Sequence, residues 1–87
     1  MTSLTRPSFW RAYRTLDPVV REAARRTYRR FADDPAHPSL RFKKLAGHDR
    51  IWSVRVNASV RALAEREGET VIWFWIGSHN DFDKLFG

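Results

Sequence analysis

The stretch that decides the fold is residues 51–66, IWSVRVNASVRALAER. Apolar residues alternate with polar ones in both of its halves: Trp52, Val54 and Val56, then Val60, Ala62 and Ala64. Alternation with a period of two is typical of strands that bury one face. The stretch therefore predicts two neighbouring strands, over residues 51–57 and 59–66, that share one buried face.

This shared face restricts how the two strands can pair. If Val54 and Val60 lie on the same side, the numbers of any two residues that face each other across the strands must add up to an even number, for example residue 56 opposite residue 60. Arg55 and Arg61 then project together from the open face. Like charges opposed across a strand pair are destabilising unless something anionic lies between them, so the pattern indicates a phosphate or carboxylate site. The alternative is that both guanidinium groups extend into water.

Other segments supply the remaining strands. Residues 71–76 are all apolar, which predicts a strand in the middle of the sheet that ends at Gly77. Residues 66–69 have the composition of a turn before it, and so do residues 46–50. Residues 40–45 predict a short extended stretch, and residues 2–6 could add an edge strand.

The first third of the chain has helical periodicity. Phe9, Trp10, Tyr13 and Leu16 recur at three- and four-residue spacing, which predicts a helix over about residues 7–16. Asp17 and Pro18 have the pattern of a cap and first turn, so a second helix should run to about Asp33. Its apolar stripe comprises Val20, Ala23, Ala24, Thr27, Tyr28 and Phe31. We expect one α+β domain over residues 1–87, with this helical hairpin on one face of a three- to four-stranded antiparallel sheet.

The charge distribution favours an anionic partner. The net charge is +6 and the pI about 10.8, with 13 arginines among the 16 basic residues. Residues 1–61 carry 14 Lys and Arg against 5 Asp and Glu, so the positive field belongs to the first two thirds. The planar fork of arginine suits phosphate, which favours nucleic acid over a merely solvated basic surface. We expect a cytoplasmic protein that has no signal peptide and does not enter the membrane.

Side chains that could perform chemistry are few. His79 comes directly after the predicted central strand, and histidine can pass a proton to a leaving group near neutral pH. A lone histidine in a loop is more often structural. Of Lys43 and Lys44, alternation sends one to the open face, and the neighbouring apolar residues favour Lys43. The sequence has no glycine-rich phosphate loop, no HExxH motif and no cysteine, so no metal and no cofactor are expected.

Three segments together form a familiar set of motifs. They are residues 37–45 (HPSLRFKKL), residues 51–56 (IWSVRV) with Arg61, and residues 73–83 (WFWIGSHNDFD). This set resembles the RelE/ParE superfamily of type II toxin–antitoxin toxins, and in particular a branch whose members end in a Trp-Ile-Gly-Ser-His motif followed by a Tyr-Asp pair. The resemblance covers about residues 17–87 and implies the same order of two helices followed by strands.

The resemblance also implies roles for individual residues. Ribonuclease members of the superfamily cleave mRNA with basic and acid/base side chains on the open sheet face, which activate a ribose 2′-hydroxyl. Arg61 matches the family's strand arginine, suited to phosphate stabilisation, and His79 matches a position used for general acid work. Lys43 or Lys44 falls where members carry a lysine or glutamate suited to the base or charge-stabilising role. Our candidate catalytic residues are therefore Arg61, His79 and Lys43, and our candidate RNA phosphate-binding residues are Arg55, Lys44 and Arg41.

The sequence departs from the family pattern at two points. Phe82 stands where close relatives usually have tyrosine, so any role of that hydroxyl is absent. The region of Lys43 has no glutamate, so the general base remains unassigned. In addition, the family's first strand precedes the helices and would here have to come from residues 1–6.

The leading functional hypothesis is a metal-independent mRNA endonuclease toxin that acts on the ribosome and inhibits translation. One alternative is a gyrase-directed toxin of the ParE kind, in which the helical hairpin contacts a protein target. Another is a degenerate toxin that only binds its antitoxin. The expected partners are a cognate antitoxin, mRNA and the ribosome. The open sheet face, with an edge near residues 40–45 that could be unpaired, suits a second chain, so we expect an acidic antitoxin segment either to fill the cationic site or to displace the catalytic end at His79. The alternative is that the antitoxin acts through the two helices alone and leaves the sheet face open to RNA.

Overall fold

The centre of the molecule is a five-stranded sheet, which a computed structural model describes together with its helices over residues 1–86. The strands are β1 (Thr2–Thr5), β2 (Lys43–Lys44), β3 (Ile51–Arg55), β4 (Val60–Glu67) and β5 (Thr70–Ser78). Their order in the sheet is β1-β5-β4-β3-β2. β1 pairs with β5 in parallel and every other pair is antiparallel, so the sheet is mixed and larger than the expected three- to four-stranded antiparallel one. The possible strand at residues 2–6 is confirmed as an edge strand.

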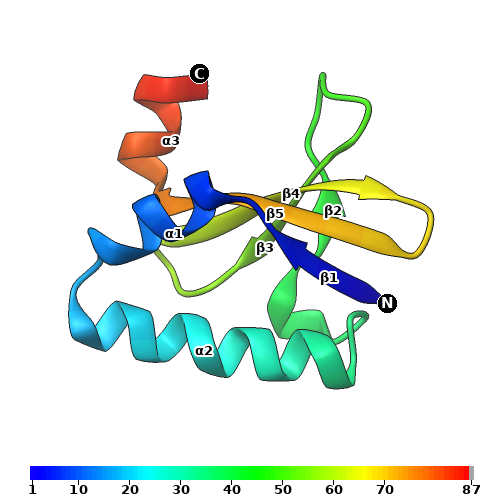
Figure 1. Ribbon diagram of the computed structural model, residues 1–87, viewed down its shortest axis with the longest axis horizontal. Coiled ribbons are helices and arrows are strands. Elements are labelled where there is room, and N and C mark those ends of the chain that lie inside the picture. Colours follow the sequence, from blue (N-terminus) through cyan, green and yellow to red (C-terminus); the bar gives the residue numbers. More distant parts are fainter. Residues whose placement is uncertain (87) are drawn as a thin grey trace.

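The helices enclose this sheet from both sides (Figure 1). The predicted hairpin is confirmed as α1 (Pro7–Arg14) and α2 (Pro18–Asp33), and the chain ends in α3 (His79–Phe86). Pro18 occupies the first turn of α2 as expected, but the side chain of Asp17 makes no capping hydrogen bond. Within the described residues, no helix has the length and apolarity needed to span a membrane.

The core lies between the sheet and the helical hairpin. Its buried members are Phe31, Leu40, Val54, Val60, Ala62, Ala64, Val71, Trp73 and Ile76. Phe31 is the one residue of the predicted α2 stripe that is fully buried, and Tyr28 is 51% exposed. The remaining residues of the stripe are only partly buried or exposed, and a hollow of about 930 Å³ lies between the hairpin and the sheet.

The register of β3 and β4 follows the parity argument. Arg55 lies opposite Arg61 in the ladder, and the amide of Val56 donates to the carbonyl of Val60 over 2.9 Å. β3 itself ends at Arg55, two residues before the predicted end. Asn57 closes the turn that follows, because its side-chain oxygen accepts from the amides of Ser59 and Val60 at 2.8 and 2.9 Å.

The register of β5 contains a bulge that alternation does not reveal. Opposite Leu63 and Ala64 the pairing shifts, so that Trp75 and Trp73 are their partners. One extra residue of β5 is thereby accommodated, and side chains three positions apart, Trp73 and Ile76, both reach the helix-side core.

Gly77 does not end β5, contrary to expectation. It is buried inside the strand, and a Cβ atom there would lie 2.5 Å from the Trp75 ring. The position therefore requires glycine because the indole passes directly over the backbone.

The extended stretch predicted at residues 40–45 is mostly irregular. Residues Pro38–Leu40 form a 3₁₀ turn, and Arg41 has the left-handed backbone conformation with a φ of 46°. Only Lys43 and Lys44 pair with β3. Leu40 is buried in the core instead of following an extended alternation, which explains why the strand begins late.

Candidate nucleic-acid interface

The sheet face opposite the helical hairpin carries the arginine pair. Across β3, β4 and β5, the register aligns Arg55, Arg61 and Gly77 in one row. Gly77 has no side chain, and the Trp75 indole occupies the space above it at the β5 end of this row. Arg55 is exposed and Arg61 is half-buried, so both guanidinium groups can be reached from solvent.

This face is less open than the sequence suggests, because α3 covers its β5 end. The Trp75 ring lies 5.4 Å from the ring of Phe86 and 6.3 Å from that of Phe82, measured between centroids. Leu63, which pairs with Trp75 on this side of the sheet, is only 1% exposed. α3 is thus anchored by an aromatic cluster and is not a purely solvated helix.

Arg61 is held between two side chains of α3. Its Cζ atom lies 4.9 Å from the centroid of the Phe82 ring, and its Nη2 atom lies 3.4 Å from Nδ1 and 3.5 Å from Nε2 of His79. Two nearly equal distances place the guanidinium nitrogen over the imidazole ring and not in line with either ring nitrogen. Both contacts are at the long limit of hydrogen bonding, so the imidazole nitrogens keep their capacity to form further hydrogen bonds.

The backbone fixes His79 at this position. Its amide donates to the carbonyl of Ser59 over 2.9 Å, which ties the start of α3 to the turn between β3 and β4. The hydroxyl of Ser78 accepts from the amide of Asp81 over 3.0 Å and so caps the helix. His79 is therefore an exposed side chain whose backbone is held at the junction of β5 and α3.

The charge at this site is not neutralised by the protein. Over residues 1–86, neither Arg55 nor Arg61 forms an ion pair. Two facing guanidinium groups without a carboxylate between them have the charge and the donors to accept an anion. The same part of the chain contains no group of three or more His, Asp or Glu residues that could hold a metal ion.

The other predicted residues are less close to this centre. Lys43 pairs with Ser53 and therefore lies on the same face as Arg55, but on edge strand β2, two strands from β4. With strands spaced about 4.8 Å apart, its backbone is roughly 10 Å across the sheet from that of Arg61. Lys44 is opposite Trp52 and so starts from the other face, and Arg41 precedes the strand. The structure thus brings Arg55, Arg61 and His79 together, with Lys43 further along the same face.

Sequence reasoning missed the role of Phe82. It treated this position only as a lost hydroxyl, whereas the ring provides a surface for the Arg61 guanidinium. The spacing of Phe82 three residues after His79, one helical turn, is the signal that could have placed both on the same side of a helix.

A second surface lies on the opposite side of the sheet. The hollow between the hairpin and the sheet is lined mostly by apolar and aromatic side chains, among them Leu4, Trp10, Tyr28 and Trp73. Arg25 and Arg29 of α2 also line it. The exposed fractions of Leu4, Trp10 and Tyr28 are 51%, 42% and 51%, which is unusual for side chains that could pack inward.

Comparison with solved structures shows which fold this is. A chain of the RelB–RelE antitoxin–toxin complex of Methanococcus jannaschii superposes with a TM-score of 0.79 at 15% identity, covering 97% of this chain and 99% of that one. YafQ from Escherichia coli gives a TM-score of 0.74 at 9% identity, with 98% and 97% covered. The YoeB/ParE toxin from Agrobacterium tumefaciens gives 0.68 at 20% identity, with 91% and 99% covered. At these identities the likeness shows the fold alone.

The sequence itself carries the family assignment. No curated protein matches it. The profile of the ParE-like toxin domain, however, matches residues 18–84, which include α2, the four antiparallel strands and most of α3. With the fold of the RelE, YoeB and YafQ toxins and this match over most of its length, the chain belongs to the ParE-like toxin domain family of the RelE/ParE superfamily.

Proposed function

We propose that this toxin domain is an endoribonuclease that cleaves mRNA, with the translating ribosome as its site of action. The observation that carries the proposal is the clamped Arg61, held between Phe82 and His79 and facing Arg55 on an accessible sheet face. This arrangement combines two cations for a phosphate with one group that can transfer a proton. Those are two of the three components that cleavage through a 2′-hydroxyl requires.

The proposed step is an in-line displacement at phosphorus. The 2′-oxygen of a ribose attacks the adjacent phosphate, the bond to the 5′-oxygen breaks, and a 2′,3′-cyclic phosphate forms. Arg61, supported by Arg55, stabilises the charge on the non-bridging oxygens, and His79 donates a proton to the departing 5′-oxygen. The proton of the 2′-hydroxyl leaves to a base outside this set or to water.

The position of Lys43 favours a charge contact for it over the role of base. It lies about two strands from Arg61, whereas a base must come within roughly 3 Å of the hydroxyl it deprotonates. A neighbouring phosphate of the same RNA strand lies within reach of such a lysine. Lys44 and Arg41 are proposed as outer phosphate contacts on the same edge.

The test is a double variant, Arg61→Ala with His79→Ala. We expect it to abolish growth arrest and mRNA cleavage on translating ribosomes while the circular dichroism spectrum and thermal midpoint stay close to those of the wild type. The matched control is Arg14→Ala with His48→Ala, because both residues are exposed and belong to α1 and a loop. If the site variant cleaves as well as the control, the site is wrong.

A second candidate function is suggested by the family match, whose profile describes ParE-like toxins. In this alternative the chain poisons gyrase, the helical hairpin contacts the target, and His79 is incidental. RNA fragmentation with intact plasmid supercoiling supports the endonuclease. Trapped gyrase–DNA breaks with an SOS response support the gyrase poison, and a lone chain without toxicity supports a degenerate toxin.

We further propose that a cognate antitoxin neutralises the chain. Solved chains with this fold include RelB–RelE and RelBE2 antitoxin–toxin complexes. Strand addition at the β2 edge is disfavoured, since that strand has two residues and both are exposed lysines. The hollow between hairpin and sheet is the better site for an apolar segment, and Arg25 and Arg29 suit acidic residues that flank it.

A further inference from the structure

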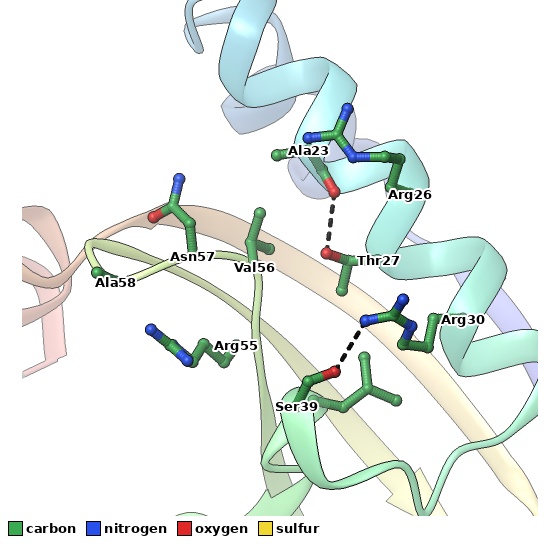
Figure 2. Close-up of a pocket in the computed structure, with 10 residues that line it drawn as sticks. Ala23, Arg26, Thr27, Arg30, Ser39, Arg55, Val56, Asn57 and Ala58 are labelled. Carbon is green, nitrogen blue, oxygen red and sulfur yellow. Dashed lines mark hydrogen bonds between the residues drawn. The ribbon is translucent and has the colours of Figure 1, made fainter.

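A second group of arginines lines a pocket at the junction of α2 and the turn after β3. The pocket has a volume of about 340 Å³ and lies between one side of α2 and residues 55–58. Its cationic members are Arg26, Arg30 and Arg55. Figure 2 shows Arg26 and Arg30 extending from the helix, with the strand that carries Arg55 across from them.

The positive charge of this pocket is only partly compensated. Glu22 is its sole ion-pair partner within residues 1–86: the carboxylate lies 3.6 Å from Arg26 but is shared with Arg25 at 2.5 Å. Arg30 donates to the hydroxyl of Ser39 over 3.1 Å, which is a neutral partner. No acidic side chain lines the pocket, whereas the lining includes the polar groups of Thr27, Ser39 and Asn57.

Arg55 connects this pocket to the site on the sheet. It lines the pocket, and it also lies opposite Arg61 in the ladder. In Figure 2 its side chain leaves β3 on the side away from α2, while Val56 points toward the helix. Arg55 therefore stands between two groups of arginines: Arg61 is its neighbour on the open sheet face, and Arg30 and Arg26 of α2 line the pocket with it.

We propose that this succession of arginines is a track for the phosphate backbone of a single RNA strand, with the pocket of Arg26 and Arg30 as a phosphate site remote from the cleaved bond. The proposal rests on the endoribonuclease function above and extends it to the path of the substrate. A small anion cannot bridge cations that lie on both sides of β3, whereas a polyanion can bind them in series. Arginine's planar fork with nearby hydroxyl and amide groups suits phosphate oxygens.

The experiment measures binding of 2′-O-methyl RNA, which keeps every phosphate but cannot be cleaved through a 2′-hydroxyl. The pocket variant is Arg26→Gln with Arg30→Gln, and the matched control is Arg11→Gln with Arg14→Gln, two exposed arginines of α1. In a plot of the logarithm of the RNA association constant against the logarithm of the salt concentration, each phosphate contact with a single strand contributes roughly 0.7 to the slope. Loss of two contacts should therefore reduce the magnitude of the slope by about 1.4. The control should leave the slope unchanged. On translating ribosomes, both variants should cleave an mRNA truncated just after the cut site at the wild-type rate, because such an RNA does not extend to the pocket.

A further variant and a competitor distinguish a phosphate site from a structural effect and from a peptide site. Ser39→Ala removes the hydrogen bond of Arg30 without changing charge, and an equal loss in that variant would assign the effect to structure and overturn the track. Polyglutamate that competes as well as RNA of equal charge would make the pocket a peptide site and overturn it too. If the wild type cleaves RNA but the pocket variant keeps the full slope, the track is wrong and the proposed function stands. If the wild type neither binds 2′-O-methyl RNA nor cleaves mRNA on translating ribosomes, both fail.

Discussion

At the scale of single residues, Phe82 is the side chain that orients Arg61. Its ring lies under the guanidinium and also packs on Trp75 and Phe86, so it links the helix to the charged site. We regard it as a positioning residue, because it has no group that can bind phosphate or carry a proton. A cation–π contact at an exposed site contributes about 0.5–1 kcal/mol.

Phe82→Leu should therefore lower kcat for RNA cleavage by about two- to fivefold, the equivalent of that energy, and leave KM nearly unchanged. Phe82→Tyr keeps the ring and should keep the activity. Steady-state kinetics on a defined mRNA fragment, with thermal midpoints for all three proteins, provide the measurement. Full activity of the leucine variant, or a loss that merely follows unfolding, would argue against positioning.

Gly77 yields a prediction about packing. A Cβ atom at this position meets the six-membered part of the Trp75 indole at 2.5 and 2.7 Å, so the ring must move and disturb its contacts with α3. Gly77→Ala should cost about 1–3 kcal/mol in the free energy of unfolding. In a Trp75→Phe background, which lacks the clashing atoms, the same change should cost clearly less. Additive costs in urea denaturation would contradict this explanation.

The facing arginines were predictable because a strand with a period of two can be paired so that either of its two faces is buried, and the buried valines determine which face it is. The surroundings of His79 were not predictable, because a histidine that follows a strand does not indicate that the nearby Arg61 will stack on the Phe82 ring. Lys43 lies between these cases: alternation gave its face correctly, but the distance to Arg61 depends on the order of strands in the sheet.

At the scale of elements, β1 depends on a parallel ladder with β5 that alternation in so short a segment cannot predict. The amide of Thr2 donates to the carbonyl of Glu69, the residue before β5, over 2.7 Å, and the amide of Arg6 donates to that of Trp73 in β5 over 2.9 Å. By alternation the amide of Leu4 therefore faces β5 and that of Ser3 faces the free edge. Leu4→Pro should then destabilise the protein by about 1–3 kcal/mol through a lost ladder bond. Ser3→Pro should cost much less. Equal losses in thermal unfolding would show that β1 is held by something other than its hydrogen bonds.

Two further elements show why the predicted sheet was incomplete. β5 is apolar on both faces, so its sequence has no contrast that could reveal the bulge opposite Leu63 and Ala64. α3 is eight residues long, too short for periodicity to separate a solvated helix from one that packs with Phe82 and Phe86. In both cases tertiary contacts, not local preference, determine which side chains are buried.

At the scale of the whole molecule, the two sides of the sheet offer different chemistry. The α3 side has the cationic site of Arg55 and Arg61 beside His79, whereas the hairpin side has an apolar hollow with Arg25 and Arg29 among its lining. We propose the first surface for RNA and the second for an apolar protein segment. The antitoxin can therefore bind first in the hollow on the hairpin side, and its acidic residues can then reach Arg55 and Arg61 on the α3 side of the sheet.

This division predicts how the antitoxin complex responds to substitution of exposed apolar residues on α2. Tyr28 is 51% exposed and lines the hollow, while Val19 is 79% exposed and does not. Because truncation of a buried interface aromatic costs upwards of about 1.4 kcal/mol, Tyr28→Ala should weaken binding of the cognate antitoxin at least tenfold, mainly through faster dissociation. Val19→Ala should leave the rate constants unchanged, and Arg25→Gln with Arg29→Gln should slow association and weaken its dependence on salt. Surface plasmon resonance measures both rate constants. Should Tyr28→Ala bind as tightly as Val19→Ala while Arg61→Ala alone abolishes binding, the antitoxin occupies the sheet face and the hollow is not its site.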